Sequence, residues 1–146
     1  MRLFLGTILF ILMGAGNIHA EMVAVAKNLA DIRSSPSEVV STILFQVPRY
    51  YPLSSMESRD NFLKVTDYLG NSGWIRKDSV DDTRTVVVNI AGRANVRSGP
   101  GDGNRIVFKA HDGVCFKVLA EKDDWLQVEH ETGVTGWIFK GLVWGN

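Results

Sequence analysis

One thiol and two imidazoles are the side chains of this sequence best suited to nucleophilic chemistry. Cys115 is the single cysteine among 146 residues, and His111 and His130 are its nearest histidines. A catalytic thiolate needs a base within hydrogen-bonding distance, so Cys115 could form a peptidase pair with either His111 or His130. However, Cys115 interrupts the apolar strand that contains Val114, Phe116 and Val118, which favours a small packing side chain. We therefore predict no catalytic residue and no enzyme activity, and the lone cysteine excludes an internal disulfide framework.

Three glycines at alternate positions could suggest a phosphate-binding loop. Gly99, Gly101 and Gly103 are followed by the apolar residues 106–108, which have the pattern of a strand. A phosphate loop requires a helix N-terminus at that point, so this interpretation is rejected. Asp102 and Asn104 also lack the further oxygen ligands of a calcium loop. The sequence therefore predicts no metal site and no cofactor.

Two arginines, Arg33 and Arg97, occupy matching contexts beside small and apolar residues. A guanidinium there could bind a ligand carboxylate, such as a peptide terminus. Alternatively, it could bond the carbonyls of its own loop or stack on Trp74 or Trp137. The presence of arginine in both contexts favours the structural role, although Arg97 also remains a candidate for ligand binding.

Composition and charge are those of an ordinary globular protein. Hydrophobic residues make up 45% of the chain and charged residues 22%, with 16 basic residues balancing 16 acidic ones. A nucleic-acid-binding protein usually carries an excess of basic residues, so a nucleic-acid partner is not expected.

The N-terminal twenty residues have the organisation of a signal peptide. Arg2 precedes an apolar run from Leu3 to Met13, and the small Ala20 suits the cleavage position. The run is shorter than the roughly 20 residues that a helix needs to cross a bilayer. We expect a signal-peptide helix over residues 1–20, cleavage before Glu21, and a periplasmic or secreted protein without a membrane span.

The remaining sequence repeats itself. Residues 30–36 match residues 94–100 at a spacing of 64, and residues 62–65 match residues 125–128 at a spacing of 63. Residues 72–75 match residues 135–138 at the same spacing of 63. Conserved order over this length indicates a tandem duplication. We predict one domain over residues 21–80, a polar linker over 81–85 and a second domain over 86–146.

Both copies have the pattern of short strands separated by turns. Val114, Phe116 and Val118 alternate with less apolar residues, and a turn at residues 130–133 precedes another apolar stretch. Units of about 60 residues built this way indicate small β-barrels, in which a few large aromatic side chains form much of the core. The predicted fold is all-β, with two tandem barrels of five or six strands each.

The second copy resembles a bacterial SH3-like (SH3b) domain. The resemblance rests on Asn95-Val96-Arg97-Ser98-Gly99-Pro100, Gly113, Asp124-Trp125 with Val128, and Gly136-Trp137-Ile138. The first copy keeps Arg33, Ser34, Pro36, Val65, Gly73, Trp74 and Ile75. It carries Ser35, Tyr50 and Phe62 at the positions of Gly99, Gly113 and Trp125. The first copy is thus interpreted as a degenerate or specialised SH3-like domain, and the counterpart of Cys115 is Pro52.

The resemblance implies an exported, non-catalytic binding module. Domains of this family often bind cell-wall peptides or protein partners, frequently beside a cell-wall hydrolase. Here the signal segment and two barrels leave too few residues for a catalytic domain. We expect the partner to be an envelope protein or a peptidoglycan peptide. The alternative is a structural or assembly scaffold of the envelope, with the two barrels packed as one rigid unit.

Four side chains are candidate ligand contacts in this interpretation. Trp125 is expected at a groove, because aromatic faces line the ligand grooves of SH3-like folds. Tyr50 occupies a glycine-like turn position, and Trp144 could fill the seam between barrels or contact a partner directly. Arg97 is the fourth candidate. The motif residues with an expected structural role are Arg33, Pro36, Trp74, Pro100, Gly136 and Trp137.

Overall fold

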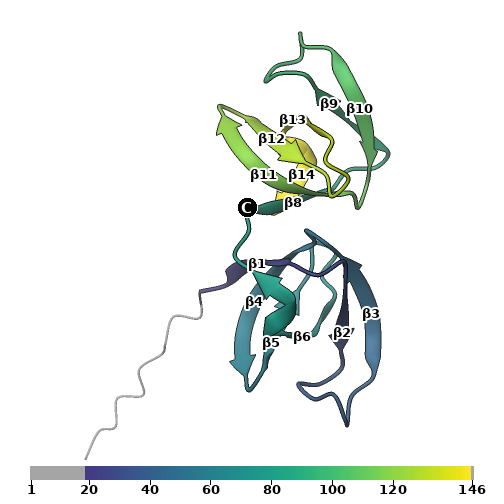
Figure 1. Ribbon diagram of the computed structural model, residues 1–146, viewed down its shortest axis with the longest axis vertical. Coiled ribbons are helices and arrows are strands. Elements are labelled where there is room, and N and C mark those ends of the chain that lie inside the picture. The colour runs from purple at the N-terminus through teal and green to yellow at the C-terminus, as the bar shows by residue number, and fades with distance from the viewer. Residues whose placement is uncertain (1–18, 146) are drawn as a thin grey trace, which may run out of the picture.

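The computed structural model describes residues 19–145, and the predicted signal-peptide helix lies almost entirely outside the described residues. The described chain forms two seven-stranded antiparallel sheets and two single-turn 3-10 helices. Each sheet curls into a small barrel, and the two barrels follow one another along the chain (Figure 1). The predicted all-β fold with two tandem units is confirmed. No helix within residues 19–145 is long and apolar enough to span a membrane.

The first sheet has the strand order β3-β2-β6-β5-β4-β1-β7. Its elements are β1 (Glu21–Val25), β2 (Leu29–Arg33), β3 (Ile43–Pro48), β4 (Pro52–Arg59), β5 (Phe62–Thr66), β6 (Ser72–Arg76), the 3-10 helix η1 (Lys77–Ser79) and β7 (Val80–Asp81).

The second sheet repeats this order as β10-β9-β13-β12-β11-β8-β14. Its elements are β8 (Thr85–Val88), β9 (Arg93–Arg97), β10 (Ile106–His111), β11 (Cys115–Lys122), β12 (Trp125–Glu129), β13 (Thr135–Phe139), the 3-10 helix η2 (Lys140–Leu142) and β14 (Val143–Gly145).

The predicted count of five or six strands per barrel is too low. After each 3-10 turn the chain pairs once more with the first strand of its own unit, Val80 with Val25 and Val143 with Val88. The extra strands have only two and three residues. Alternation of apolar and polar residues needs a longer stretch before it marks a strand, so the sequence gives these closing strands no signal.

The duplication is visible in the backbone as well as in the sequence. Arg33 pairs with Trp74 in the first sheet, as Arg97 pairs with Trp137 in the second. The same tight turn before β4 and β11 has a positive φ in both units. Tyr50 adopts φ 65° there in the first unit, where the second has a glycine.

Each barrel has its own apolar core. The core of the first consists of Val25, Ala30, Ile32, Val47, Leu53, Val65 and Ile75. That of the second consists of Val86, Val88, Ala94, Val96, Ala110, Phe116, Leu126, Val128 and Ile138.

Phe116 is the one aromatic residue in these two clusters, and neither motif tryptophan belongs to them, which corrects the expectation that large aromatic side chains form much of the core. Successive residues of a strand point to opposite faces, and Ile75 and Ile138 take the core side. Trp74 is buried on the outer face, with the Arg59 guanidinium 5.4 Å from its ring centroid. Trp137 is half-buried.

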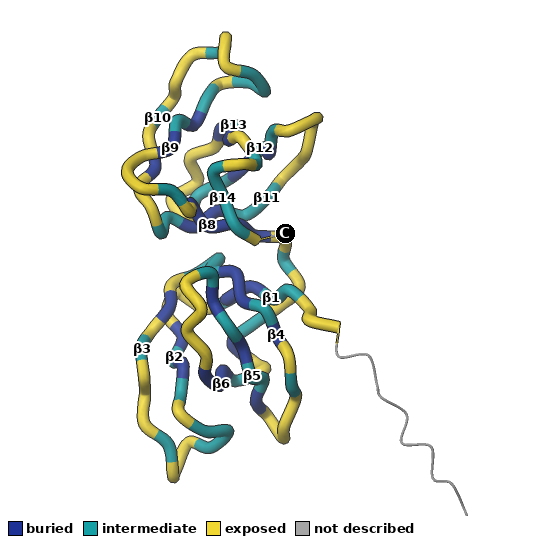
Figure 2. Tube along the Cα trace, turned by 180° about the vertical axis from the view of Figure 1, so that it is seen from behind, coloured by how far each residue is buried: buried dark blue, intermediate teal, exposed yellow. Residues whose placement is uncertain are grey.

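The barrels meet along a seam made from equivalent strands. Val86 and Val88 point into the second core, so Val87 points outward, yet it is fully buried. Cys115 and Trp144 lie opposite Val87 on the two neighbouring strands and share its face. Ala24, the counterpart of Val87 in the first unit, is also fully buried. Figure 2 shows the buried stretches of β1 and β8 on the facing sides of the barrels.

Side chains of the first barrel complete the seam. The ring of Tyr68 lies 6.5 Å from that of Trp144 and 6.1 Å from that of Tyr51. A Cβ placed on Gly145 would lie 3.3 Å from the Cβ of Pro52. The seam therefore joins an aromatic cluster of the first unit to the closing strand β14 of the second.

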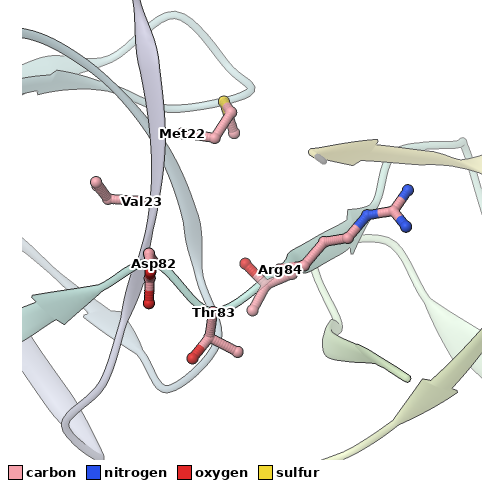
Figure 3. A pocket seen from close by; sticks show the side chains of 6 residues that line it. Met22, Val23, Asp82, Thr83 and Arg84 are labelled. Atoms are coloured by element: carbon pink, nitrogen blue, oxygen red, sulfur yellow. The ribbon is translucent and has the colours of Figure 1, made fainter. Parts of the chain in front are cut away.

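The connection between the sheets is short. Residues 82–84 lie between β7 and β8, and the Thr83 N–H donates to Asp81 Oδ1 at 3.0 Å. The predicted linker, 81–85, thus includes one residue of each flanking strand. A cavity of about 120 Å³ beside it is lined in part by Met22, Asp82 and Arg84 (Figure 3). The Arg84 guanidinium donates to the Glu121 carboxylate of the second barrel and is thus already paired. We therefore interpret this cavity as a packing gap beside the connection.

Candidate functional site

A groove on the second barrel brings together two of the four ligand candidates, Arg97 and Trp125. It has a volume of about 340 Å³ and lies between β9, the loop after it, β12, the end of β13 and η2. Its lining includes the large apolar and charged side chains of Ile90, Arg93, Arg97, Asp102, Trp125, Phe139 and Leu142.

An aromatic pair forms one wall of this groove. Trp125 and Phe139 lie opposite each other at the ends of β12 and β13. Their ring centroids are 5.7 Å apart and their planes meet at 62°, the edge-to-face arrangement that aromatic pairs favour. Trp125 is half-buried and Phe139 is 41% exposed. The pair thus presents apolar surface to solvent while holding its own geometry.

Arg97 holds the loop that forms the opposite wall. Its Nη1 donates to the carbonyl oxygens of Asp102 and Asn104, at 2.9 Å each. Its Nη2 lies 3.8 Å from Asp102 Oδ1, and its side chain is only 16% exposed. Arg33 contacts the equivalent loop of the first unit through a side chain instead, because its Nη1 donates to Ser41 Oγ at 3.3 Å. The arrangement agrees with the structural role favoured from the repeated arginine.

Arg93 and Asp102 place opposite charges at the rim of the groove. Arg93 begins β9 and is exposed, and within the described chain its guanidinium forms no ion pair. The Asp102 side chain is 93% exposed. Neither residue was predicted for the site, nor was Phe139, because the register that brings Phe139 opposite Trp125 is set by the fold.

The first barrel has an equivalent groove with a different character. It has a volume of about 180 Å³, and Arg76 takes the position of Phe139. Phe62, at the position of Trp125, is buried and does not line the groove. The groove of the first barrel therefore lacks the aromatic wall that the second barrel has.

Ion pairs fill the groove of the first barrel instead. Arg76 bonds Glu38 at 2.5 Å and Asp78 at 2.7 Å, and Lys27 lies 3.3 Å from Asp78. The Arg76 guanidinium, helped by Lys27, holds the pKa of the Asp78 carboxyl well below its usual range. Charges that already pair with one another leave little for a ligand to bind. This contrast supports the interpretation of the first copy as specialised.

The other two ligand candidates lie away from the groove. Tyr50 is half-buried in the turn before β4, where its N–H donates to the Val25 carbonyl at 2.9 Å. Trp144 lies half-buried at the seam against Tyr68. Of the two roles considered for Trp144, the structure places it at the seam.

The remaining motif residues shape the loops and the close strand contact. Pro36 and Pro100 lie half-buried in equivalent loops, which are closed by bonds from Ser34 N to Thr42 O and from Ser98 N to Arg105 O. Gly136 is buried on β13, where it faces β9.

Cys115 has the surroundings of a packing residue. It is 6% exposed, and burial, followed by the charge of Glu131, raises the pKa of its thiol from 9.0 to about 12. Its sulfur contacts the Gly113 carbonyl, whereas His130 bonds Thr132. Such an environment disfavours the thiolate that a nucleophile requires. Among residues 19–145, no cluster of metal-ligating side chains occurs.

Comparison with known proteins identifies the class of the second unit. Residues 91–145 match the family model described as the bacterial SH3 domain, and they form such a domain in this chain. A segment of 49 residues is 37% identical to the putative N-acetylmuramoyl-L-alanine amidase YrvJ of Bacillus subtilis strain 168. The alignment covers 34% of this chain and 10% of the amidase.

Solved structures similar to this chain include three NlpC-type proteins. NlpC2 and NlpC1 from Trichomonas vaginalis are 16% and 18% identical, each with a TM-score of 0.39. The alignments cover 87% and 93% of this chain, and 48% and 50% of theirs. An NlpC/P60 family protein from Bacillus cereus ATCC 10987 is 10% identical, with a TM-score of 0.42, over 86% of this chain and 56% of its own. The chain thus spans about half the length of these proteins.

Proposed function

We propose that this chain is an exported, non-catalytic binding protein that holds a peptidoglycan peptide in the groove of its bacterial SH3 domain. The observation that carries the proposal is the Trp125–Phe139 pair, which lies in one groove with Arg93, a cation that forms no ion pair within residues 19–145. The rings offer apolar contact to the aliphatic parts of a short peptide. Arg93 supplies a partner for one of its carboxylates.

The similarity to an amidase supports a cell-wall ligand rather than wall hydrolysis by this chain. The shared 49 residues are a tenth of that enzyme. The single thiol of this chain, that of Cys115, is buried at the seam, which disfavours its use as a nucleophile. Binding through preformed aromatic and charged side chains needs neither a metal nor a cofactor.

Sedimentation with peptidoglycan sacculi tests the proposal. The chain from Glu21 onward, which contains every described strand, is mixed with purified sacculi and pelleted. We expect saturable pelleting that Trp125→Ala and Arg93→Gln greatly reduce. Leu119→Ala and Arg105→Gln, which change exposed side chains of the same barrel outside the groove, serve as matched controls.

Two results would reject the proposal. The first is failure of the unsubstituted chain to pellet at high sacculus concentration, which would direct the search to an envelope protein as partner. The second is full pelleting by correctly folded Trp125→Ala. Folding of each variant is checked by its circular dichroism spectrum and its thermal transition.

The seam favours a second function, that of a rigid envelope scaffold. Val87 and Ala24 are fully buried between the barrels, and Trp144 contacts the aromatic cluster of the first unit. If the two barrels form one rigid body, the unsubstituted chain should unfold in a single thermal transition, and Trp144→Ala should split it into two. Two separate transitions in the unsubstituted chain would speak against this function.

A further inference from the structure

A second hollow of the SH3 domain lies outside the groove described above. It has a volume of about 200 Å³ and is lined by Phe108, Ala110, Val114, Phe116, His130 and Val134, together with two flanking residues of β10. Phe116 and Ala110 form a buried apolar floor, whereas Val134 is 49% exposed at the mouth. The hollow is therefore an apolar pocket that opens to solvent.

The first barrel shows what fits at this place. Tyr51 is the counterpart of Val114, and its ring packs against the first core. The Tyr51 hydroxyl donates to Asp67 Oδ2 at 3.1 Å, and Asp67 is the counterpart of His130. The position that is hollow in the second barrel is thus filled in the first by an aromatic ring with a polar tip.

Two substitutions leave the space open in the second barrel. Val114 replaces the tyrosine, and Ala110 replaces the Val47 of the first unit. Phe116 is larger than its counterpart Leu53, but its ring is fully buried in the floor. A pocket of about 200 Å³ remains. Apolar cavities of about 150 Å³ bind benzene in other proteins, so the space suits one aromatic ring.

The walls match the chemistry of such a ring. Phe108 and Phe116 lie 6.1 Å apart, and His130 meets Phe116 edge-on at 6.0 Å. Thr132 occupies His130 Nδ1, with its hydroxyl oxygen at 2.8 Å and its N–H donating at 3.3 Å, so Nε2 is the ring nitrogen left for a ligand. An incoming ring would find aromatic partners on two sides and, in the imidazole of His130, a hydrogen-bonding group at the position of Asp67.

We infer that this pocket is a docking site for one tyrosine or phenylalanine side chain of a partner protein, distinct from the Trp125–Phe139 groove. The chain's own Tyr51 is the template for the occupant. A partner bound here leaves the groove free, because the two sets of lining residues have no member in common.

The first probe is p-cresol, which is the tyrosine side chain without a backbone, and the second is the peptide acetyl-Gly-Tyr-Gly-amide. Chemical shifts of the chain from Glu21 onward are recorded during titration with each. We expect saturable shifts at Ala110, Val114 and His130 with both probes. Intermolecular nuclear Overhauser effects should join the ring protons to Val114 and Phe108.

Val114→Tyr places a tyrosine ring of the chain itself in the pocket. It should weaken the binding of both probes by at least about tenfold, which is about 1.4 kcal/mol. Val107→Tyr adds the same ring at an exposed position outside the pocket and should leave binding unchanged. Unchanged binding in folded Val114→Tyr would overturn the inference. Nuclear Overhauser effects from the probe to Trp125 instead of Val114, measured on the unsubstituted chain, would also overturn it. Binding of p-cresol without the peptide would exclude a partner side chain.

Discussion

Replacing Gly136 by alanine tests the close approach of β13 to β9, which sets the shape of the ligand groove. A Cβ on Gly136 would lie 2.5 Å from Val96 Cγ1 and 3.1 Å from the carbonyl oxygen of Arg97. Val96 is fully buried in the core and cannot move freely. Overpacking of this kind costs about 1–3 kcal/mol. Because a change of 1 kcal/mol shifts the melting temperature of a chain of this size by about 4 °C, we expect a decrease of about 4–12 °C.

Gly103→Ala is the matched control for this prediction. A Cβ on Gly103 meets no atom within 4 Å, so the same added methyl should be neutral or slightly stabilising. Differential scanning calorimetry of both variants measures the difference. Equal melting temperatures for Gly136→Ala and Gly103→Ala would refute the argument that strand proximity demands glycine at position 136.

Three further predictions follow from burial and hydrogen bonding. The pKa of Cys115 is raised to about 12, which lowers its thiolate population about a thousandfold at pH values below 9. Labelling by a disulfide reagent should therefore be about a thousandfold slower in the folded chain than in urea. Equal labelling rates would contradict the burial of the thiol. Arg97→Gln removes two bonds to loop carbonyls and should lower the free energy of unfolding in urea titrations by about 1.5–3 kcal/mol, whereas Arg93→Gln should leave it unchanged; equal effects would contradict the loop-holding role. Burial and the charge of Asp67 raise the pKa of Tyr51, so the protonated phenol stabilises the fold below the unfolded pKa of about 10, and that stability is lost as the pH rises further. Tyr51→Phe should abolish this part of the alkaline destabilisation. A pH profile of stability that Tyr51→Phe leaves unaltered would refute the prediction.

The repeat was the most informative property of the sequence. Paired residues at spacings of 63 and 64 predicted the two units, and alternation predicted their strands. The glycine-like position of Tyr50 also proved to be a turn with positive φ. Such features are local, because each depends on the conformation of a few neighbouring residues.

The candidate site was predictable only in part. Trp125 and Arg97 were chosen from the motif, and both line the groove. Phe139 and Arg93 were not, because their approach to Trp125 depends on strand register and on how the sheet curls. The seam position of Trp144 depends on packing between barrels, which the sequence left open between two roles.

Divergence of the two grooves was also visible only in three dimensions. The presence of Phe62 at the position of Trp125 could be noted from the sequence, but the ion pair of Arg76 with Glu38 joins residues 38 positions apart. A charge pattern does not show which charges meet. The copies have therefore kept one fold while the same groove became aromatic in one and internally paired in the other.

The stoichiometry of peptide binding tests the central claim most directly. Soluble muropeptides, released from sacculi by a glycan-cleaving enzyme, are titrated into the chain from Glu21 onward by isothermal calorimetry. The account predicts one peptide per chain, with heat of binding that Trp125→Ala abolishes. Two peptides per chain, or undiminished binding by folded Trp125→Ala, would contradict it.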